Sequence, residues 1–389
     1  MAKYQMSFWN YVHTGVLNPK EAVADWQALG MNLATSFHYD PTKHKKKDFL
    51  KMLNECKKRN IQVIVCDKRT DFVTIRKIGK EAFEENVKQA VRDFGSHPAT
   101  FGFHVGDEPN KAGMEDMIFA YKTVKKYAPH LKHFVNLLPI WHDDGFEKSF
   151  GFPPSGYKAY LDEIVKEAGL DILSYDCYAQ CCYFEQDKYQ DVYLENLKVF
   201  GEVARENNIP LYTSLLSVGH WSLRCPNEDD FRWQLSTATA MGCTGFLWFF
   251  IYERFYDNNF RVPPIDLFWE KTETFEWLSR QNRIFMRFIA PQLQDYTWES
   301  VKTLNTTVCD LPQFEDGDYG VKKIQLAVNE TAPLMIANFK GEKDNRVVIV
   351  NLERQLPTSI TVTVKNGDAE WKHRQWLAAG QILTFRVRE

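Results

Sequence analysis

The run Gly106-Asp107-Glu108-Pro109 places two carboxylic acids in sequence directly after an apolar segment, Thr100–Val105. A carboxylic acid that burial keeps protonated near neutral pH can donate a proton to a leaving group. An ionised one can act as a base or a nucleophile. Pro109 restricts the backbone of the residue before it, so the direction of Glu108 is fixed locally. Glu108 is therefore the first candidate for a catalytic residue.

Other short apolar runs also end in residues that can do chemistry or bind a polar ligand. Aromatic residues make up 14% of the chain, and aromatic rings at strand ends suit a sugar-binding cleft because the C–H faces of a sugar stack on them. The further candidate catalytic carboxylates are Glu253 and Asp176. The candidate substrate-binding residues are Asn10, His38, Tyr39, Asp67, Asp107, Trp141, His142, Tyr178, His220, Trp221 and Tyr252.

Eight strand-like runs, each followed by a segment with helical periodicity, must position these residues. The predicted strands are Tyr4–Tyr11, Asn32–His38, Gln62–Asp67, Thr100–Val105, His133–Leu138, Ile172–Tyr178, Leu211–Leu216 and Gly245–Tyr252. The predicted helices are Pro19–Leu29, Lys45–Arg59, Lys80–Phe94, Met114–Tyr127, Gly156–Ala168, Tyr189–Asn207, Glu228–Met241 and Thr272–Ile289. Eight such units predict a (β/α)8 TIM barrel, whose reacting groups lie at the C-terminal ends of the strands.

An open doubly wound sheet is the alternative arrangement of the same units. That fold would need a glycine-rich phosphate-binding turn after the first strand, and the residues 10–15 (NYVHTG) do not form one. After Pro291 the pattern changes to short alternating runs at Val321–Val328, Leu334–Asn338, Arg346–Leu352, Ile360–Val364 and Ile382–Val387. We therefore expect a catalytic barrel over residues 1–295 and a small all-β antiparallel sandwich, an accessory domain, over 296–389.

The segment "HPATFGFHVGDEP" resembles the fourth-strand segment of clan A glycoside hydrolases, particularly β-galactosidase-like members. The stretch "KTETFEWLSRQN" is similar to their eighth-helix region, and "LAAGQILTF" resembles the last strand of their sandwich domains. The resemblance implies that Glu108 is the acid/base that protonates the glycosidic oxygen. Asp107 departs from the family pattern, in which Asn precedes the Glu. Its side chain is also expected on the opposite face from that of Glu108 if the strand continues.

The seventh strand departs further, because "YTSLLSV" over Tyr212–Val218 lacks the nucleophilic Glu that the family carries there. Three other carboxylates could replace this missing nucleophile, and we rank them in the order Glu253, Asp176 and Asp67. A carboxyl separation of about 5–5.5 Å from Glu108 would indicate a retaining enzyme, and about 6.5–9.5 Å an inverting one. Each substitute also has a structural interpretation, as an ion-paired or loop-orienting acid.

Three functions follow from these residues. The first is hydrolysis of a β-linked oligosaccharide or galactoside-like glycoside with Glu108 as general acid/base. The second is a carbohydrate-binding pseudo-enzyme that has lost the nucleophile of strand 7. The third is a metal-dependent barrel enzyme with Asp67, Asp107 and Asp176 as ligands. We expect neither a metal nor a cofactor, because the histidines come from separate strands with no helical pair.

The net charge, the apolar segments and the cysteine content of the chain limit the partners and locations that we expect. A net charge of −3 with mixed signs argues against nucleic acid or an anionic membrane as partner. The chain has no apolar stretch long enough for a membrane span and no signal-like start. Its eight cysteines are scattered without metal-ligand spacing, which favours free thiols in the cytoplasm. A trimmed secretion signal would leave the same picture, and the sugar, the linkage and the oligomeric state stay open.

Overall fold

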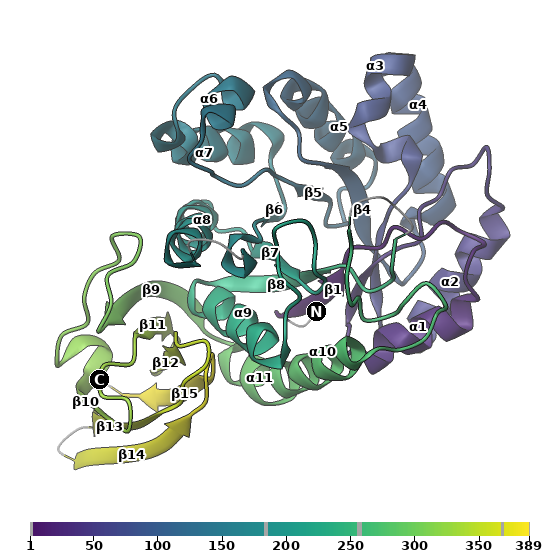
Figure 1. The fold of residues 1–389 in the computed structure, drawn as a ribbon. Coiled ribbons are helices and arrows are strands. Elements are labelled where there is room, and N and C mark those ends of the chain that lie inside the picture. The colour runs from purple at the N-terminus through teal and green to yellow at the C-terminus, as the bar shows by residue number, and fades with distance from the viewer. Residues whose placement is uncertain (1–2, 183–185, 255–258, 367–368, 389) are drawn as a thin grey trace.

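The computed structural model describes residues 3–182, 186–254, 259–366 and 369–388 (Figure 1). Strands and helices alternate in its first part, as the sequence predicts. The strands are β1 (Gln5–Phe8), β2 (Leu33–Thr35), β3 (Gln62–Val65), β4 (Thr100–Asp107), β5 (Phe134–Asn136), β6 (Leu173–Asp176), β7 (Leu211–Leu216) and β8 (Cys243–Phe249). Each overlaps a predicted strand, and most are shorter because the predicted ends include loop residues.

Long helices follow the strands and surround them in Figure 1. They are α1 (Pro19–Ala28), α2 (Lys46–Lys58), α4 (Lys80–Ala90), α5 (Met114–Tyr127), α7 (Tyr157–Ala168), α8 (Gln186–Glu206), α9 (Glu228–Ala240) and α10 (Glu273–Ile284). Short helices are α3 (Ile75–Ile78), α6 (Asp144–Phe150) and α11 (Ala290–Leu293), and π-helical turns at Val91–Gly95 and Phe285–Ile289 extend α4 and α10. Within the described ranges, no helix combines the length and the apolar character that crossing a membrane requires.

The eight strands form two parallel sheets of four, in the orders β1-β8-β7-β6 and β2-β3-β4-β5. Backbone hydrogen bonds link the sheets at both edges. At the β5–β6 seam, the Leu137 amide donates to the Ser174 carbonyl over 2.8 Å. At the β1–β2 seam, the Asn32 amide donates to the Met6 carbonyl over 3.2 Å. This order of parallel strands fits a (β/α) barrel.

A separate apolar cluster lies among the strands. Each of the eight strands, or a residue next to it, contributes a side chain to this cluster. Its buried members are Trp9, Leu33, Ile64, Phe101, Phe134, Ile172, Tyr212, Val218, Leu247 and Phe250. Large side chains that converge from successive parallel strands fill the interior of a barrel. The larger core packs between these strands and the helices and continues into the C-terminal part.

The C-terminal part is two antiparallel sheets, as expected for a sandwich. One has the order β15-β12-β11-β9 and the other β10-β13-β14. The strands are β9 (Thr297–Leu304), β10 (Val321–Ala327), β11 (Leu334–Lys340), β12 (Asn345–Asn351), β13 (Thr358–Asn366), β14 (Ala369–Leu377) and β15 (Ile382–Val387). The sequence analysis missed β9 and β14. Both are edge strands whose side chains are largely in contact with solvent, so their sequences carry little apolar alternation.

Helix α9 joins the two parts. It begins with a capping box in which Asn227 and Asp230 satisfy each other's backbone amides. The Trp233 indole donates to the Leu352 carbonyl of the C-terminal part over 2.9 Å. Gly380, at φ +65°, passes so close that a Cβ there would come within 2.7 Å of Trp233. Consequently α9 is covered by strands on one side and by the β domain on the other, which lies beside it in Figure 1.

Candidate active site

The backbone at the end of β4 brings Asp107 and Glu108 into one recess. The pairing of β4 with β5 shifts register between His104 and Gly106, as at a β-bulge. Gly106 lies at φ +152°, where a Cβ would come within 2.1 Å of the Phe72 ring, so only glycine fits. Glu108 itself has φ +46°. The strand alternation therefore ends here, and the expectation that the two side chains face opposite ways is wrong.

Asn136 and Asp176, at the ends of β5 and β6, complete a cluster with these carboxyls. The Asn136 amide nitrogen donates to Asp176 over 2.7 Å and to Asp107 over 3.1 Å. Glu108 and Asp176 are hydrogen-bonded to each other through their carboxyl groups. Two carboxyls in contact cannot both ionise cheaply, so this pair holds a proton near neutral pH.

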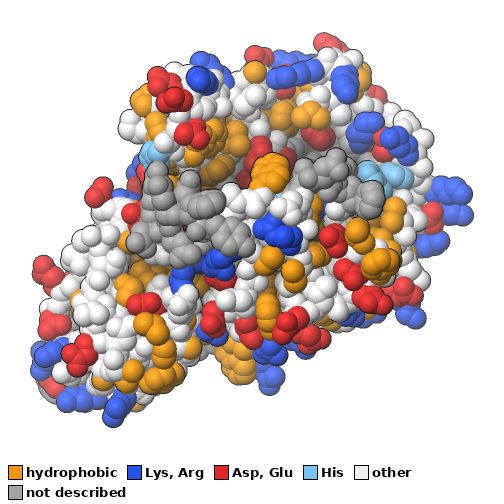
Figure 2. Space-filling view, viewed as in Figure 1, with side chains coloured by type: hydrophobic (Ala, Val, Ile, Leu, Met, Phe, Trp, Pro, Cys, Tyr) orange, Lys and Arg blue, Asp and Glu red, His pale blue; other side chains and the backbone are white. Residues whose placement is uncertain are grey.

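Burial raises the pKa of every carboxyl in the cluster. The pKa of Asp107 rises to about 7, through burial first and the charge of Glu108 second. Burial also raises the pKa of Glu108, and it raises that of Asp176 well above its usual range, helped by the charges of Glu108 and Asp107. Asp107 and Glu108 keep surface in contact with solvent. They therefore lie in a recess that surrounds them with protein yet stays open to a ligand, and Figure 2 shows acidic side chains inside such a hollow.

Aromatic rings and a cation lie near these carboxyls. Tyr11 follows β1, and the charges of Asp107, Asp176 and Glu108 all act on its hydroxyl. The Arg254 guanidinium lies 3.7 Å from the centre of the Tyr11 ring. Tyr178 stacks on Phe249 with the ring centres 5.0 Å apart. Carboxyls, aromatic rings and a guanidinium are thus close together at the ends of β1, β4, β6 and β8.

The first-ranked partner carboxylate, Glu253, lies elsewhere. Its amide bonds to the Ile265 carbonyl over 2.8 Å, and the groups that act on its carboxyl are Leu267 and Asp266, not Glu108. Tyr252 also turns outward, because its hydroxyl accepts from the Trp26 indole of α1 over 2.8 Å. The next residue, Arg254, faces the recess instead. The structure thus reverses the expected order, with Asp176 in contact with Glu108.

Asp67 and Tyr39 belong to a structural cluster beside β3. The Asp67 carboxylate binds the Arg69 guanidinium through contacts of 2.7 to 3.2 Å, and both side chains are buried. The Tyr39 ring packs on Phe49 and Phe94 with its centre 5.2 and 5.1 Å from theirs. Burial raises the pKa of Asp67 despite the ion pair. This arrangement corresponds to the salt-bridged interpretation of Asp67, and Asp67 and Tyr39 also line a cavity together with His38 and His104.

Asn10 and His38 lie at the ends of β1 and β2, next to the recess. Asn10 is buried, and its side chain bonds to the Thr35 carbonyl over 3.2 Å and to the Val12 amide over 3.1 Å. His38 lies beside Tyr11, with ring centres 6.3 Å apart. Burial, with the neighbouring His13, lowers the pKa of His38 to about 4, so it is neutral at physiological pH. The neutral His38 ring can therefore both donate and accept hydrogen bonds, whereas the Asn10 side chain is bonded to the backbone.

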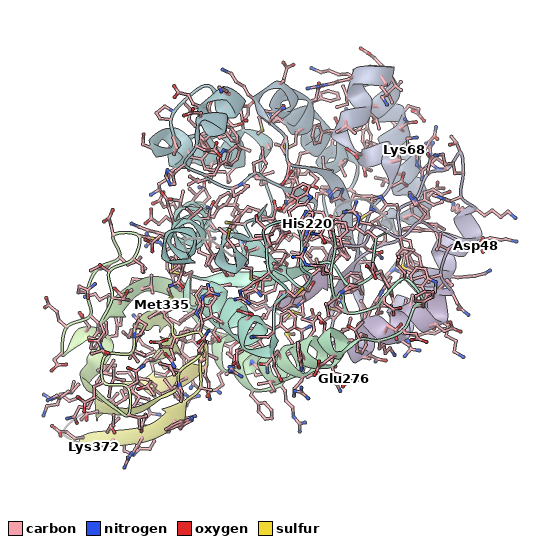
Figure 3. The ribbon with its side chains drawn as sticks, viewed as in Figure 1. Asp48, Lys68, His220, Glu276, Met335 and Lys372 are labelled. Atoms are coloured by element: carbon pink, nitrogen blue, oxygen red, sulfur yellow. The ribbon has the colours of Figure 1, made fainter. Side chains whose placement is uncertain are left out.

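The remaining candidates lie on two loops. Trp141 donates to Asp143 in its own loop over 2.9 Å, and the exposed His142 lies 2.5 Å from Glu195. On the β7 side, His220 stacks on Trp221 with ring centres 4.2 Å apart, and Trp221 is 65% exposed. Figure 3 places His220 near the centre of the face seen there, away from Lys68. Of these two stacked rings, Trp221 is the one that stays exposed to solvent.

Two residues of the recess, Asn136 and Arg254, were missed by the sequence analysis. The predicted fifth strand continued to Leu138, so Asn136 was not recognised as the last polar residue of that strand. Arg254 follows the chosen Glu253, and the direction of a loop residue depends on backbone that the sequence pattern does not specify. Among the described residues, no group of three or more His, Cys, Asp or Glu side chains is arranged to hold a metal ion.

No protein-family model matches this chain, and no curated protein does. Several solved structures, in contrast, are similar to it in fold. A β-galactosidase from Bacillus circulans sp. alkalophilus superimposes with a TM-score of 0.58 at 10% identity over 77% of this chain and 58% of its own. A β-galactosidase from Rahnella sp. R3 gives 0.57 at 11% identity, with 77% and 58% covered. The chain spans about three-fifths of the length of these enzymes.

A smaller relative in fold is the endo-1,4-beta-D-mannanase from Thermotoga petrophila RKU-1. Its TM-score is 0.52 at 10% identity, over 72% of this chain and 100% of the mannanase. At such identities the likeness concerns the fold alone. The chain shares the barrel-type fold of these glycosidases, in agreement with its resemblance to clan A glycoside hydrolases.

Proposed function

We propose that this chain is a glycoside hydrolase for β-linked sugars, with Glu108 as the general acid. The observation that carries the proposal is the hydrogen-bonded pair of Glu108 and Asp176 at the ends of β4 and β6. The C-terminal ends of barrel strands are where such enzymes hold their reacting groups. We also infer that the two sheets close into a full barrel, since both seams carry hydrogen bonds and the inner cluster draws on all eight strands.

Glu108 would donate its proton to the glycosidic oxygen as the bond to the sugar breaks. A raised pKa keeps the donor protonated, and Asp176 shares its proton between turnovers. The two carboxyls are hydrogen-bonded to each other, whereas a nucleophile or a water-activating base stands about 5–5.5 Å or 6.5–9.5 Å from the acid. Asp176 is thus the proton partner of Glu108, and its position does not suit attack on the sugar.

The proposal is tested with a panel of nitrophenyl β-glycosides and the variant Glu108→Gln, which keeps the size of the side chain and removes its proton. We expect kcat to fall by about 10²-fold to 10⁴-fold on the substrate that the wild type cleaves best. The control is Glu163→Gln on the exposed face of α7, with activity unchanged. Full activity in Glu108→Gln would refute the assignment.

A sugar-binding protein without turnover is the second candidate. It is favoured by one observation, which is that the segment from β7 to Asn227 carries no carboxylate. Calorimetry then detects binding of a sugar by the wild type, while no member of the panel is cleaved. Turnover that Glu108→Gln abolishes excludes this candidate.

A further inference from the structure

We infer that Ser174 is a positioning residue, which fixes the amide of Asn136 and through it the arrangement of the three acidic residues in the recess. This inference rests on the proposed function and deepens it, because it identifies what holds Glu108 and the neighbouring acids in place. A continuous set of hydrogen bonds from β6 through β5 to β4 carries it.

Asn136, the last residue of β5, contacts all three acidic residues. Its amide nitrogen donates to Asp176 over 2.7 Å and to Asp107 over 3.1 Å. Its backbone carbonyl accepts from the Glu108 amide over 3.0 Å. The strand pairing makes this possible, because Asn136 lies opposite Asp107 in the ladder between β4 and β5. Both N–H groups of the side chain are therefore engaged, so Asn136 holds the acids and is not placed as a ligand for a substrate.

Ser174 contacts that amide from its oxygen end. The Ser174 hydroxyl donates to the Oδ1 atom of Asn136 over 3.2 Å, and both side chains are buried. Within the part of the chain that the structure describes, no other group donates to this oxygen. With the amide nitrogen turned toward the aspartates, the buried oxygen needs a donor, and Ser174 supplies it. The Ser174 bond therefore stabilises the orientation in which Asn136 donates to the acids.

Strand β6 places Ser174 and Asp176 on the same side of the sheet. Residues two apart on a strand share a face, so the hydroxyl of Ser174 and the carboxyl of Asp176 point the same way. The Leu137 amide, next to Asn136, donates to the Ser174 carbonyl over 2.8 Å, which keeps β5 in register with β6 at this level. Asn136 is thus held between two side chains of one strand, one that donates to it and one that accepts from it.

The hydrogen bonds from Asn136 oppose the effect of burial on both aspartates. Burial, helped by the neighbouring acidic charges, raises the pKa of Asp107 to about 7 and that of Asp176 well above its usual range, whereas the bond from Asn136 lowers the pKa of each. A hydroxyl that donates to an amide oxygen polarises the amide and makes its N–H groups stronger donors. Loss of the Ser174 hydroxyl should therefore raise both pKa values, and the carboxyl cluster should keep its protons to higher pH.

The first experiment measures this effect without a substrate. The aspartate carboxyl carbons are isotope-labelled for NMR, and the signal of Asp107 is assigned from its absence in Asp107→Asn. In Ser174→Ala this signal should titrate about 0.5 to 1 pH unit higher than in the wild type, which corresponds to the loss of about one net hydrogen bond. The control is Ser279→Ala on α10, since the buried Ser279 hydroxyl donates to the Ala28 carbonyl over 2.7 Å. It should leave the titration of Asp107 unchanged.

A double variant tests whether Ser174 acts through Asn136. Asn136→Leu keeps the approximate shape of the side chain and removes its polar atoms, so the Asp107 signal should titrate at still higher pH than in Ser174→Ala. Adding Ser174→Ala to Asn136→Leu should then change the titration no further. An additional rise in the double variant overturns the inference, and so does an unchanged titration in Ser174→Ala.

The link to catalysis is measured on the nitrophenyl β-glycoside that the wild type cleaves best. A general acid acts as long as it keeps its proton, so the alkaline limb of kcat/KM should move up by about 0.5 to 1 pH unit in Ser174→Ala. The same limb should stay in place in Ser279→Ala. A shifted titration with an unshifted limb overturns the role of Ser174 in catalysis while the proposed function stands. Absence of cleavage by the wild type refutes the proposed function, and the titration then still decides whether Ser174 positions the acids.

Discussion

Glu108 and Asp176 depend on each other for their protonation states. Each is a carboxyl that burial would keep neutral, and the hydrogen bond between them lets one proton serve both. Asn136 adds a donor to Asp176 and so opposes the effect of burial there. A residue pair of this kind makes the proton on Glu108 sensitive to the charge of its neighbour.

Asp176→Asn tests that dependence. An asparagine carries no charge, and its amide nitrogen can donate to the ionised form of Glu108, so the pKa of Glu108 should fall. A general acid loses activity as the pH rises through its pKa, so the alkaline limb of kcat/KM should move to lower pH. The pH profile of the variant against wild type measures this. A shift to higher pH, or no shift, contradicts the shared proton.

Asp67→Ala tests whether that carboxylate is structural. The change leaves the buried Arg69 with Asp93 as its remaining acidic partner, and breaking a buried pair costs about 3 kcal/mol. Urea unfolding should show that loss, while KM of the folded variant stays unchanged. The control is Asp48→Ala, which removes an exposed ion pair with Lys51 and should leave stability nearly as it was. A tenfold higher KM with unchanged stability would make Asp67 a substrate ligand.

At the scale of elements, the sequence pattern predicted most of the framework and less of the site. The periodicity of the apolar residues identifies buried strands and amphipathic helices. It does not identify the edge strands β9 and β14. The predicted direction of a side chain was wrong where the backbone leaves a regular strand or helix. At Glu108 the positive φ ends the strand alternation, and after β8 the loop turns Glu253 outward and Arg254 inward.

Gly106→Ala measures how tightly the end of β4 determines the site. A positive φ strains any side chain there, and the new Cβ would overlap the Phe72 ring. We expect about 3 kcal/mol or more of destabilisation, from strain and overpacking together, with loss of activity. Gly317→Ala is the matched control, because Gly317 has φ +105° but open space around it. Its cost should be about 1 kcal/mol, with full activity. Equal costs would show that the Phe72 contact is unimportant.

On the scale of the whole molecule, the α/β part and the C-terminal β part share one apolar core. The larger cluster includes Trp233 of α9 together with Met335, Val348 and Leu352 of the β domain. The Arg354 guanidinium lies 4.2 Å from the Trp233 ring centre, on the same interface. Such continuity favours cooperative unfolding of both parts.

Trp233→Ala should therefore destabilise the whole chain by about 4 kcal/mol, because the ring is buried between both parts. Calorimetry of the wild type should show a single transition, and the variant should unfold at lower temperature with an unchanged pH profile of activity. Trp371→Ala on the exposed side of β14 is the control, since that ring is 60% exposed. Two separate transitions in the wild type would contradict a shared core.

The β5–β6 seam has a consequence for the carboxyl pair. Glu108 belongs to the β2–β5 sheet and Asp176 to the β1–β8–β7–β6 sheet, so their contact crosses the boundary between two halves of the molecule. The half with β6 to β8 is attached to the β domain through α9, whose Trp233 bonds to the Leu352 carbonyl. A change in the spacing between these two sheets would therefore change the distance between the two carboxyls directly, and with it the protonation of Glu108.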